Sequence, residues 1–103
     1  MDNRWSGAMK DLITKIVQAL VDQPEEVSVN EIGGGHTTML EVRVAKTDMG
    51  KVIGKQGRTA QAIRTLLSAA SGKARKRYIL EIMEWRMYER LYPETFKTRR
   101  IKP

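Results

Sequence analysis

Apolar and polar residues recur with two different periods along residues 1–83, and the period predicts which element forms. Between Met9 and Asp22 the apolar residues are three or four positions apart, as on one face of a helix: Leu12, Ile13, Ile16, Val17 and Leu20. This helix has to end before Pro24, because proline disfavours helical backbone at the residue before it. From Val27 to Ile32 apolar and polar residues alternate, which predicts a half-buried strand.

A second alternating run follows the triple glycine Gly33-Gly34-Gly35. One face of this run is mainly apolar and carries Thr38, Leu40, Val42 and Val44. The other face carries Met39, Glu41 and Arg43. Glycine accepts the positive backbone angles of tight hairpin turns, so we predict a β-hairpin whose turn is the triple glycine.

The period becomes helical again after Val44. Asp48 is the predicted N-cap of a short helix from Met49 to Ile53. A longer helix is predicted from about Thr59, with Gly72 as its stop. Its apolar positions are Ile63, Leu66, Leu67 and Ala70, whereas Gln61, Arg64 and Ser68 are predicted to point outward.

Arg77 to Met83 is predicted to be a third strand. A helical crossover joins it to the second strand, so these two strands are expected to be parallel if they are neighbours. The predicted order is helix, strand, strand, helix, helix, strand. This order indicates an α+β fold in which helices cover one face of a mixed three-stranded sheet.

We predict one domain over residues 9–83, with an N-terminal extension over residues 1–8 and a C-terminal extension over residues 84–103. Trp85, Tyr88 and Tyr92 recur at helical spacing before Pro93, which predicts a short amphipathic helix followed by a basic tail. Two interpretations of this aromatic stripe stay open. It packs against the core of its own chain, or it binds a partner.

Composition restricts the chemistry that the chain can perform. Among its 103 residues there is no cysteine and one histidine, His36, which excludes disulfides, cysteine nucleophiles and histidine-rich zinc sites. We therefore expect no cofactor and no metal. No apolar run is long enough to span a membrane, and the first residues lack a signal-peptide pattern, so we expect a cytoplasmic protein with no membrane partner.

The net charge of +7 is unevenly distributed. Residues 43–77 contain ten basic residues and one acidic residue, which gives this stretch a net charge of +9. Such a concentration of positive charge favours a polyanionic partner. Inside the same stretch, between the two predicted helices, lies Gly54-Lys55-Gln56-Gly57, which we call the GxxG loop.

The GxxG loop has the residue types that a phosphate-binding loop needs. Two glycines remove the Cβ atoms that would hold a sugar-phosphate backbone away from the chain. The loop leads into a helix N-terminus, whose free N–H groups and positive dipole end favour phosphate. Lys51, Lys55 and Arg58 supply cations beside it.

At these residues the sequence resembles the KH domain, a module that binds single-stranded RNA or single-stranded DNA. The resemblance lies in Val52-Ile53-Gly54-Lys55-Gln56-Gly57-Arg58, with Ile63 on the next helix. Two strands before this signature and one after it resemble the prokaryotic, type II arrangement. Residues 9–83 are similar to the small single-KH proteins of bacteria, the KhpA/YlqC family, in length, element order and phrases such as Val29-Asn30-Glu31.

The resemblance implies a function and a binding surface. Proteins of this kind are expected to clamp about four unpaired nucleotides with the GxxG loop and to act as RNA chaperones or post-transcriptional regulators. They are also expected to form homodimers and to pair with a larger KH protein of the Jag/EloR type. The nucleic-acid-binding residues that it implies here are Gly54, Lys55, Gln56, Gly57, Arg58, Lys51, Val52, Ile53, Ala62 and, as a cation at the rim of the groove, Arg43.

Rival functions fit the sequence less well. Gly50 to Gln56 resembles a Walker A loop, but three residues separate Gly50 from Gly54 where four are required, and Gln56 stands where a serine or threonine has to hold magnesium. No carboxylate pair suits acid-base catalysis. We therefore expect a binding protein and not an enzyme. The alternative function is a protein-protein assembly module with incidental nucleic-acid binding.

Overall fold

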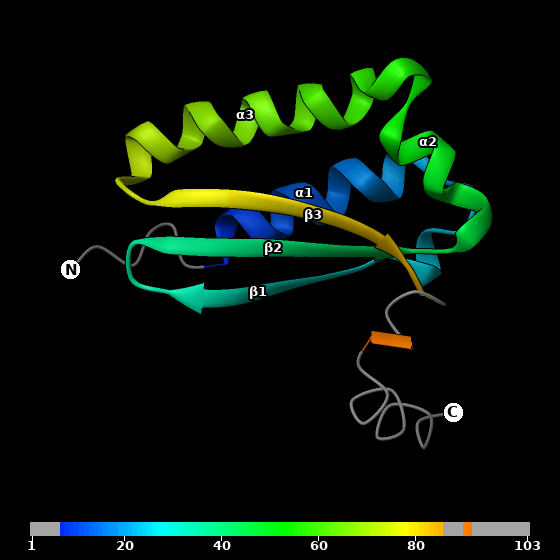
Figure 1. Cartoon of the computed structure of the whole chain (residues 1–103), viewed down its shortest axis with the longest axis horizontal. Helices are drawn as coiled ribbons and strands as arrows, with labels where there is room; N and C mark the ends of the chain where they lie inside the picture. The colour runs from blue at the N-terminus through cyan, green and yellow to red at the C-terminus, as the bar shows by residue number, and fades with distance from the viewer. Residues whose placement is uncertain (1–6, 86–89, 92–103) are drawn as a thin grey trace.

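The computed structural model describes residues 7–85 and 90–91, which build a three-stranded sheet with helices packed on one face (Figure 1). The helices and strands are, in chain order, α1 (Ala8–Leu20), β1 (Ser28–Gly34), β2 (Thr37–Val44), α2 (Met49–Ile53), α3 (Arg58–Ala74) and β3 (Arg77–Glu84). Short 3₁₀ turns at Pro24–Glu26, Lys46–Asp48 and Lys55–Gly57 connect some of them. In this part of the chain, no helix combines the length and the apolar character needed to cross a membrane.

The strands lie in the order β1-β2-β3. β1 and β2 are antiparallel, with Val29 opposite Val42. β2 and β3 are parallel, with Leu40 opposite Leu80, because α2 and α3 carry the chain back across the sheet between them. The predicted α+β fold, its element order and its mixed sheet are therefore confirmed.

One continuous core lies between the sheet and the helices. Its buried side chains come from α1, α2, α3 and all three strands: Met9, Ile13, Val17, Val29, Leu40, Val42, Val44, Val52, Ile63, Leu67, Tyr78 and Leu80. Leu40, Val42 and Val44 lie in the core as predicted, but Glu41 and Arg43 on the other face of β2 are buried as well. The prediction that Leu66 belongs to the apolar stripe of α3 that faces the core is wrong. Leu66 is 53% exposed, because Ala60, Ile63 and Leu67 already fill the face that meets the core.

Two predicted ends of elements are also wrong. β1 continues through Gly34, which pairs with Thr37, so the hairpin turn contains Gly35 and His36 and not the whole triple glycine. α3 does not stop at Gly72 but runs to Ala74. Arg75 ends it instead, in a left-handed conformation with φ 58°. Gly34 remains part of the strand and Gly72 part of the helix, so neither glycine ends its element.

The predicted aromatic stripe after β3 is described at Trp85. Tyr88, Tyr92 and the predicted basic tail lie outside the described residues, as do residues 1–6. The Trp85 ring stacks on the Arg43 guanidinium, with Cζ 4.8 Å from the ring centroid. Its indole Nε1 donates a hydrogen bond of 2.7 Å to the backbone oxygen of Glu26. Trp85 thus packs against its own chain.

Asp48 holds the loop after α1 against the start of α2. It stands at the predicted N-cap position, but its carboxylate makes no capping hydrogen bond. Instead Oδ1 accepts from the Asp22 amide at 3.1 Å and Oδ2 from the Gln23 amide at 3.0 Å. The side chain is buried, so these two amides have taken the place of water around the charge.

We expect Asp48→Ala to lower the free energy of unfolding by about 2 to 3 kcal/mol, because it leaves two amides without their charged acceptor. Urea denaturation measures this loss. Asp22→Ala is the matched control. It breaks the ion pair of 3.2 Å between Asp22 and Lys51, whose side chains are 74% and 45% exposed, and is expected to cost under about 1 kcal/mol. Equal stability of the two variants would contradict the role assigned to Asp48.

Candidate nucleic-acid interface

The GxxG loop is a tight turn between α2 and α3, at the end of the molecule opposite the β1-β2 turn (Figure 1). The Gly54 amide donates to the Gly50 oxygen at 2.8 Å, which closes the end of α2. The Gly57 amide donates to the Gly54 oxygen at 3.0 Å, which closes the turn itself. Gly54, Gln56 and Gly57 all have positive φ, at 82°, 58° and 75°.

The two glycines have different surroundings. A Cβ on Gly54 would lie 2.7 Å from the backbone nitrogen of Thr59 and closer still to the Thr59 side chain. A Cβ on Gly57 would meet nothing within 4 Å. Gly54 is therefore required by the packing of the loop on α3, whereas Gly57 leaves an open backbone surface that a ligand can approach.

Cations and a polar amide surround this open backbone. Lys55, Gln56 and Arg58 are all exposed. Among the described residues, neither Lys55 nor Arg58 has an ion-pair partner. Lys51 is also exposed, but its Nζ lies 3.2 Å from Asp22 Oδ2, which partly neutralises it. The free positive charge is thus concentrated at Lys55 and Arg58.

The apolar candidates divide between core and surface. Val52 is fully buried and belongs to the core beneath the loop, as does Ile63. Ile53 is 38% exposed and Ala62 is exposed on α3. The structure therefore brings Ile53 and Ala62 to the surface next to the GxxG loop, with Val52 as support.

Arg43 does not reach this surface. Its side chain is 0% exposed and lies on the sheet face away from the helices, under the ring of Trp85. Nη2 donates to the hydroxyl of Ser28 at 3.3 Å. The alternation in β2 already put Arg43 opposite the core face, but the sequence carried no sign that Trp85 would cover it. A rim position for Arg43 would need this packing to open.

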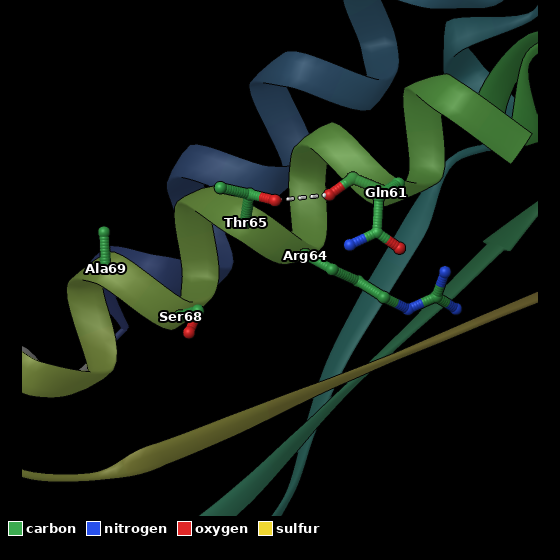
Figure 2. A pocket seen from close by; sticks show the side chains of 5 residues that line it. All are labelled: Gln61, Arg64, Thr65, Ser68 and Ala69. Atoms are coloured by element: carbon green, nitrogen blue, oxygen red, sulfur yellow. Dashed lines mark hydrogen bonds between the residues drawn. The ribbon is translucent and has the colours of Figure 1, made fainter.

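One face of α3 forms a hollow that sequence reasoning did not assign to the site. The hollow has a volume of about 560 Å³ and is lined by Gln61, Arg64, Thr65, Ser68 and Ala69. Figure 2 shows Arg64 extending outward from α3, and the Thr65 hydroxyl donating to the backbone oxygen of Gln61, at 3.0 Å. The sequence feature that could have indicated this hollow is the predicted outward face of Gln61, Arg64 and Ser68. This face continues from the GxxG loop along the helix.

Comparison with known proteins identifies the fold that presents this surface. The family model described as the KH domain of KhpA/KhpB matches residues 10–82, which include both α2 and α3 with the loop between them. The chain belongs to this KhpA/KhpB family of KH domains. Its α+β architecture is the type II KH fold, and the resemblance noted in the sequence is confirmed. No solved structure matches the chain.

Curated relatives agree with the family. A protein of Caldanaerobacter subterraneus subsp. tengcongensis, named RNA-binding protein KhpA, is 57% identical over 75 residues, which cover 73% of this chain and 100% of the relative. Proteins of the same name from Chlamydia caviae and Clostridium acetobutylicum are 51% and 53% identical, covering 74% and 73% of this chain and 97% and 100% of the relatives. These bacterial relatives are named as binding proteins, in agreement with the expectation that the chain is not an enzyme.

Proposed function

We propose that the chain binds single-stranded RNA by clamping about four nucleotides with the GxxG loop, as an RNA chaperone or post-transcriptional regulator. The observation that carries this proposal is the open backbone at Gly57, flanked by Lys55 and Arg58, which have no ion-pair partner within residues 7–85 and 90–91. The names of the KhpA relatives support RNA as the ligand. In this proposal residues 9–83 form the RNA-binding domain. The protein acts in the cytoplasm.

The loop and the helix after it contribute different interactions to binding. A phosphate lies against the backbone at Gly57, close to the N-terminus of α3, where the helix dipole favours negative charge. Lys55 and Arg58 neutralise the neighbouring phosphates, and Lys51 does so less because Asp22 competes for it. Bases lie over Ile53 and Ala62 and face the polar side chains of the α3 hollow, Gln61 and Arg64. No aromatic residue lies between Trp5 and Tyr78, so stacking on a ring contributes nothing from this surface.

We expect the double variant Lys55→Asp, Gln56→Asp to lose at least about 90% of its affinity for single-stranded RNA, since two carboxylates would repel the phosphates at the clamp. Both positions are exposed, so the fold should survive, which circular dichroism checks. The wild-type chain is expected to bind in the micromolar range, with a log-log salt slope of about −2 to −3 from three or four phosphate contacts. Fluorescence anisotropy with labelled RNA and with DNA of the same sequence measures affinity and preference.

The matched control makes the same changes on α1, as Lys10→Asp, Gln18→Asp. Both residues are exposed and belong to a different element. This control is expected to keep nearly all of its RNA affinity, because its charge change lies away from the clamp. Equal RNA binding by the folded loop variant and the wild type would overturn the clamp.

Assembly is the second candidate function, with a second copy or a larger KH protein of the Jag/EloR type as partner. Exposed large apolar side chains favour it, among them Leu66 on α3, Ile32 on β1 and Leu12 on α1. Sedimentation of the loop variant separates the two functions. Association that is unchanged in a variant without RNA binding would assign assembly to a surface other than the GxxG loop.

A further inference from the structure

A second hollow, shallow and open to solvent, lies at the other end of α3 from the GxxG loop. It has a volume of about 350 Å³ and is lined by His36, Ser71, Gly72, Arg75, Lys76 and Arg77. The β1-β2 turn, the end of α3 and the start of β3 meet there (Figure 1). The Arg77 amide donates to the His36 oxygen at 2.8 Å, which holds the hairpin turn against the start of β3. We call this the distal cavity.

The distal cavity is strongly cationic. Arg75, Lys76 and Arg77 are consecutive, and Lys73 is exposed on the last turn of α3. In the part of the chain that the structure describes, no ion pair neutralises any of the four. All six lining residues are basic, polar or glycine. No carboxylate among them therefore competes with an incoming anion for the cations of the cavity.

The backbone at the end of α3 is costly for an arginine. Arg75 has φ 58° and ψ 34°, a left-handed conformation that glycine or asparagine adopts at lower cost. Gly72, whose Cβ would meet nothing within 4 Å, leaves open backbone in the wall beside it. A turn with only a structural role would favour the opposite arrangement, with the glycine at position 75. The sequence keeps a cation there at a cost in backbone strain.

The distal cavity and the hollow near the GxxG loop lie on one side of the same helix. At about 100° per residue, Gln61, Thr65, Ser68 and Gly72 fall within one narrow stripe along α3. Their side chains are polar or absent, and none of them is buried in the core. α3 has 17 residues, so its whole length of about 25 Å separates the GxxG loop from the distal cavity, and the hollow lies between them. A strand clamped at Gly57 that follows this stripe reaches the distal cavity.

We propose that the distal cavity binds a backbone phosphodiester of the same RNA strand, beyond the nucleotides that the GxxG loop clamps. This inference rests on the proposed function and extends it. Arg75 and Arg77 supply the charge, and Gly72 leaves room for the strand to approach the helix. The chain then has two phosphate anchors about one helix length apart, so a longer RNA binds more tightly than a tetranucleotide.

The test removes two cations without changing the fold. In the variant Arg75→Asn, Arg77→Gln, asparagine suits the left-handed position and both side chains are exposed. Fluorescence anisotropy over a range of salt concentrations compares a tetranucleotide with a dodecanucleotide of unstructured RNA. We expect the dodecamer to bind about tenfold more weakly to the variant, with a log-log salt slope shallower by about 1, since each phosphate contact contributes about 0.7. Tetramer binding should change less than twofold.

Controls separate this inference from the proposed function. The variant Lys10→Gln, Lys15→Gln removes the same charge from α1 and is expected to leave both oligonucleotides unaffected. Wild-type protein that binds neither RNA would overturn the proposed function and this inference with it. Normal wild-type binding, with no difference between wild type and the Arg75 and Arg77 variant on the dodecamer, would overturn the distal site alone. An equal loss on the tetramer would also overturn it, because it would assign the effect to the general field of the protein.

Discussion

Replacing Gly54 with alanine is expected to lower the free energy of unfolding by about 2 to 4 kcal/mol and to abolish measurable RNA binding. The backbone at Gly54 has φ 82° and ψ 167°, a region that is almost closed to residues with a side chain. The new Cβ would also stand 2.7 Å from the Thr59 nitrogen, inside the first turn of α3. Because the Thr59 backbone nitrogen is in the way as well as the Thr59 side chain, a change of side-chain rotamer cannot relieve the clash and the loop has to move away from α3. That movement shifts the open backbone at Gly57, the N-cap residue of α3, out of the position in which it meets the phosphate.

Gly57→Ala is the matched control in the same loop. Its φ is 75°, so alanine is strained there too, but its Cβ would meet nothing within 4 Å. We expect a cost of about 1 to 2 kcal/mol from the backbone alone. RNA binding should still weaken, since the methyl group stands where the phosphate approaches. Urea denaturation and anisotropy of both variants measure the two effects, and equal stability losses would show that the Thr59 contact is not decisive.

The sequence predicted the elements of this fold well because the core is built on simple periods. Two-residue alternation identified the core-facing residues of β2. Helical spacing identified Ile13 and Val17 on α1, although Leu12 and Leu20 of the same predicted stripe are exposed. The sequence-based prediction failed where a local stop signal was overridden by the neighbouring residues of the element. Gly72 is a frequent stop residue, yet α3 continues past it and ends at Arg75, which no local rule favours in a left-handed conformation.

The candidate site was predictable as a segment but not as a surface. The GxxG loop is encoded within a few consecutive residues, so its position between α2 and α3 follows from local sequence. The environments of Lys51 and Arg43 depend on residues far along the chain, Asp22 and Trp85. The sequence offered Lys51 as a cation beside the loop, and the resemblance implied Arg43 at the rim of the groove, although Lys51 is paired and Arg43 is buried.

The second large loss of stability is expected for substitutions of Trp85 and Arg43, which stack on each other on the sheet face away from the helices. Trp85→Ala removes the ring that stacks on the guanidinium and the indole that donates to the Glu26 oxygen. A cation-π contact contributes about 0.5 to 2 kcal/mol and a hydrogen bond about 1 kcal/mol, and the half-buried ring contributes less than the about 1.5 to 3 kcal/mol of a fully buried large side chain. These terms overlap, so we expect a loss of about 2 to 4 kcal/mol in the free energy of unfolding, measured by urea denaturation.

Trp85→Phe separates these contributions, since it keeps an aromatic ring over Arg43 and deletes the indole N–H. We expect it to cost about 1 to 2 kcal/mol, mainly the hydrogen bond to Glu26. Arg43→Lys loses the planar stack as well, because an ammonium group cannot lie flat on the ring. Without denaturant, where the variants are folded, all three should have the RNA affinity of the wild type, because Arg43 is buried away from the GxxG loop. A folded Arg43→Lys variant with RNA binding weakened as much as in the loop variant would return Arg43 to the rim of the groove and contradict the packing described for Trp85.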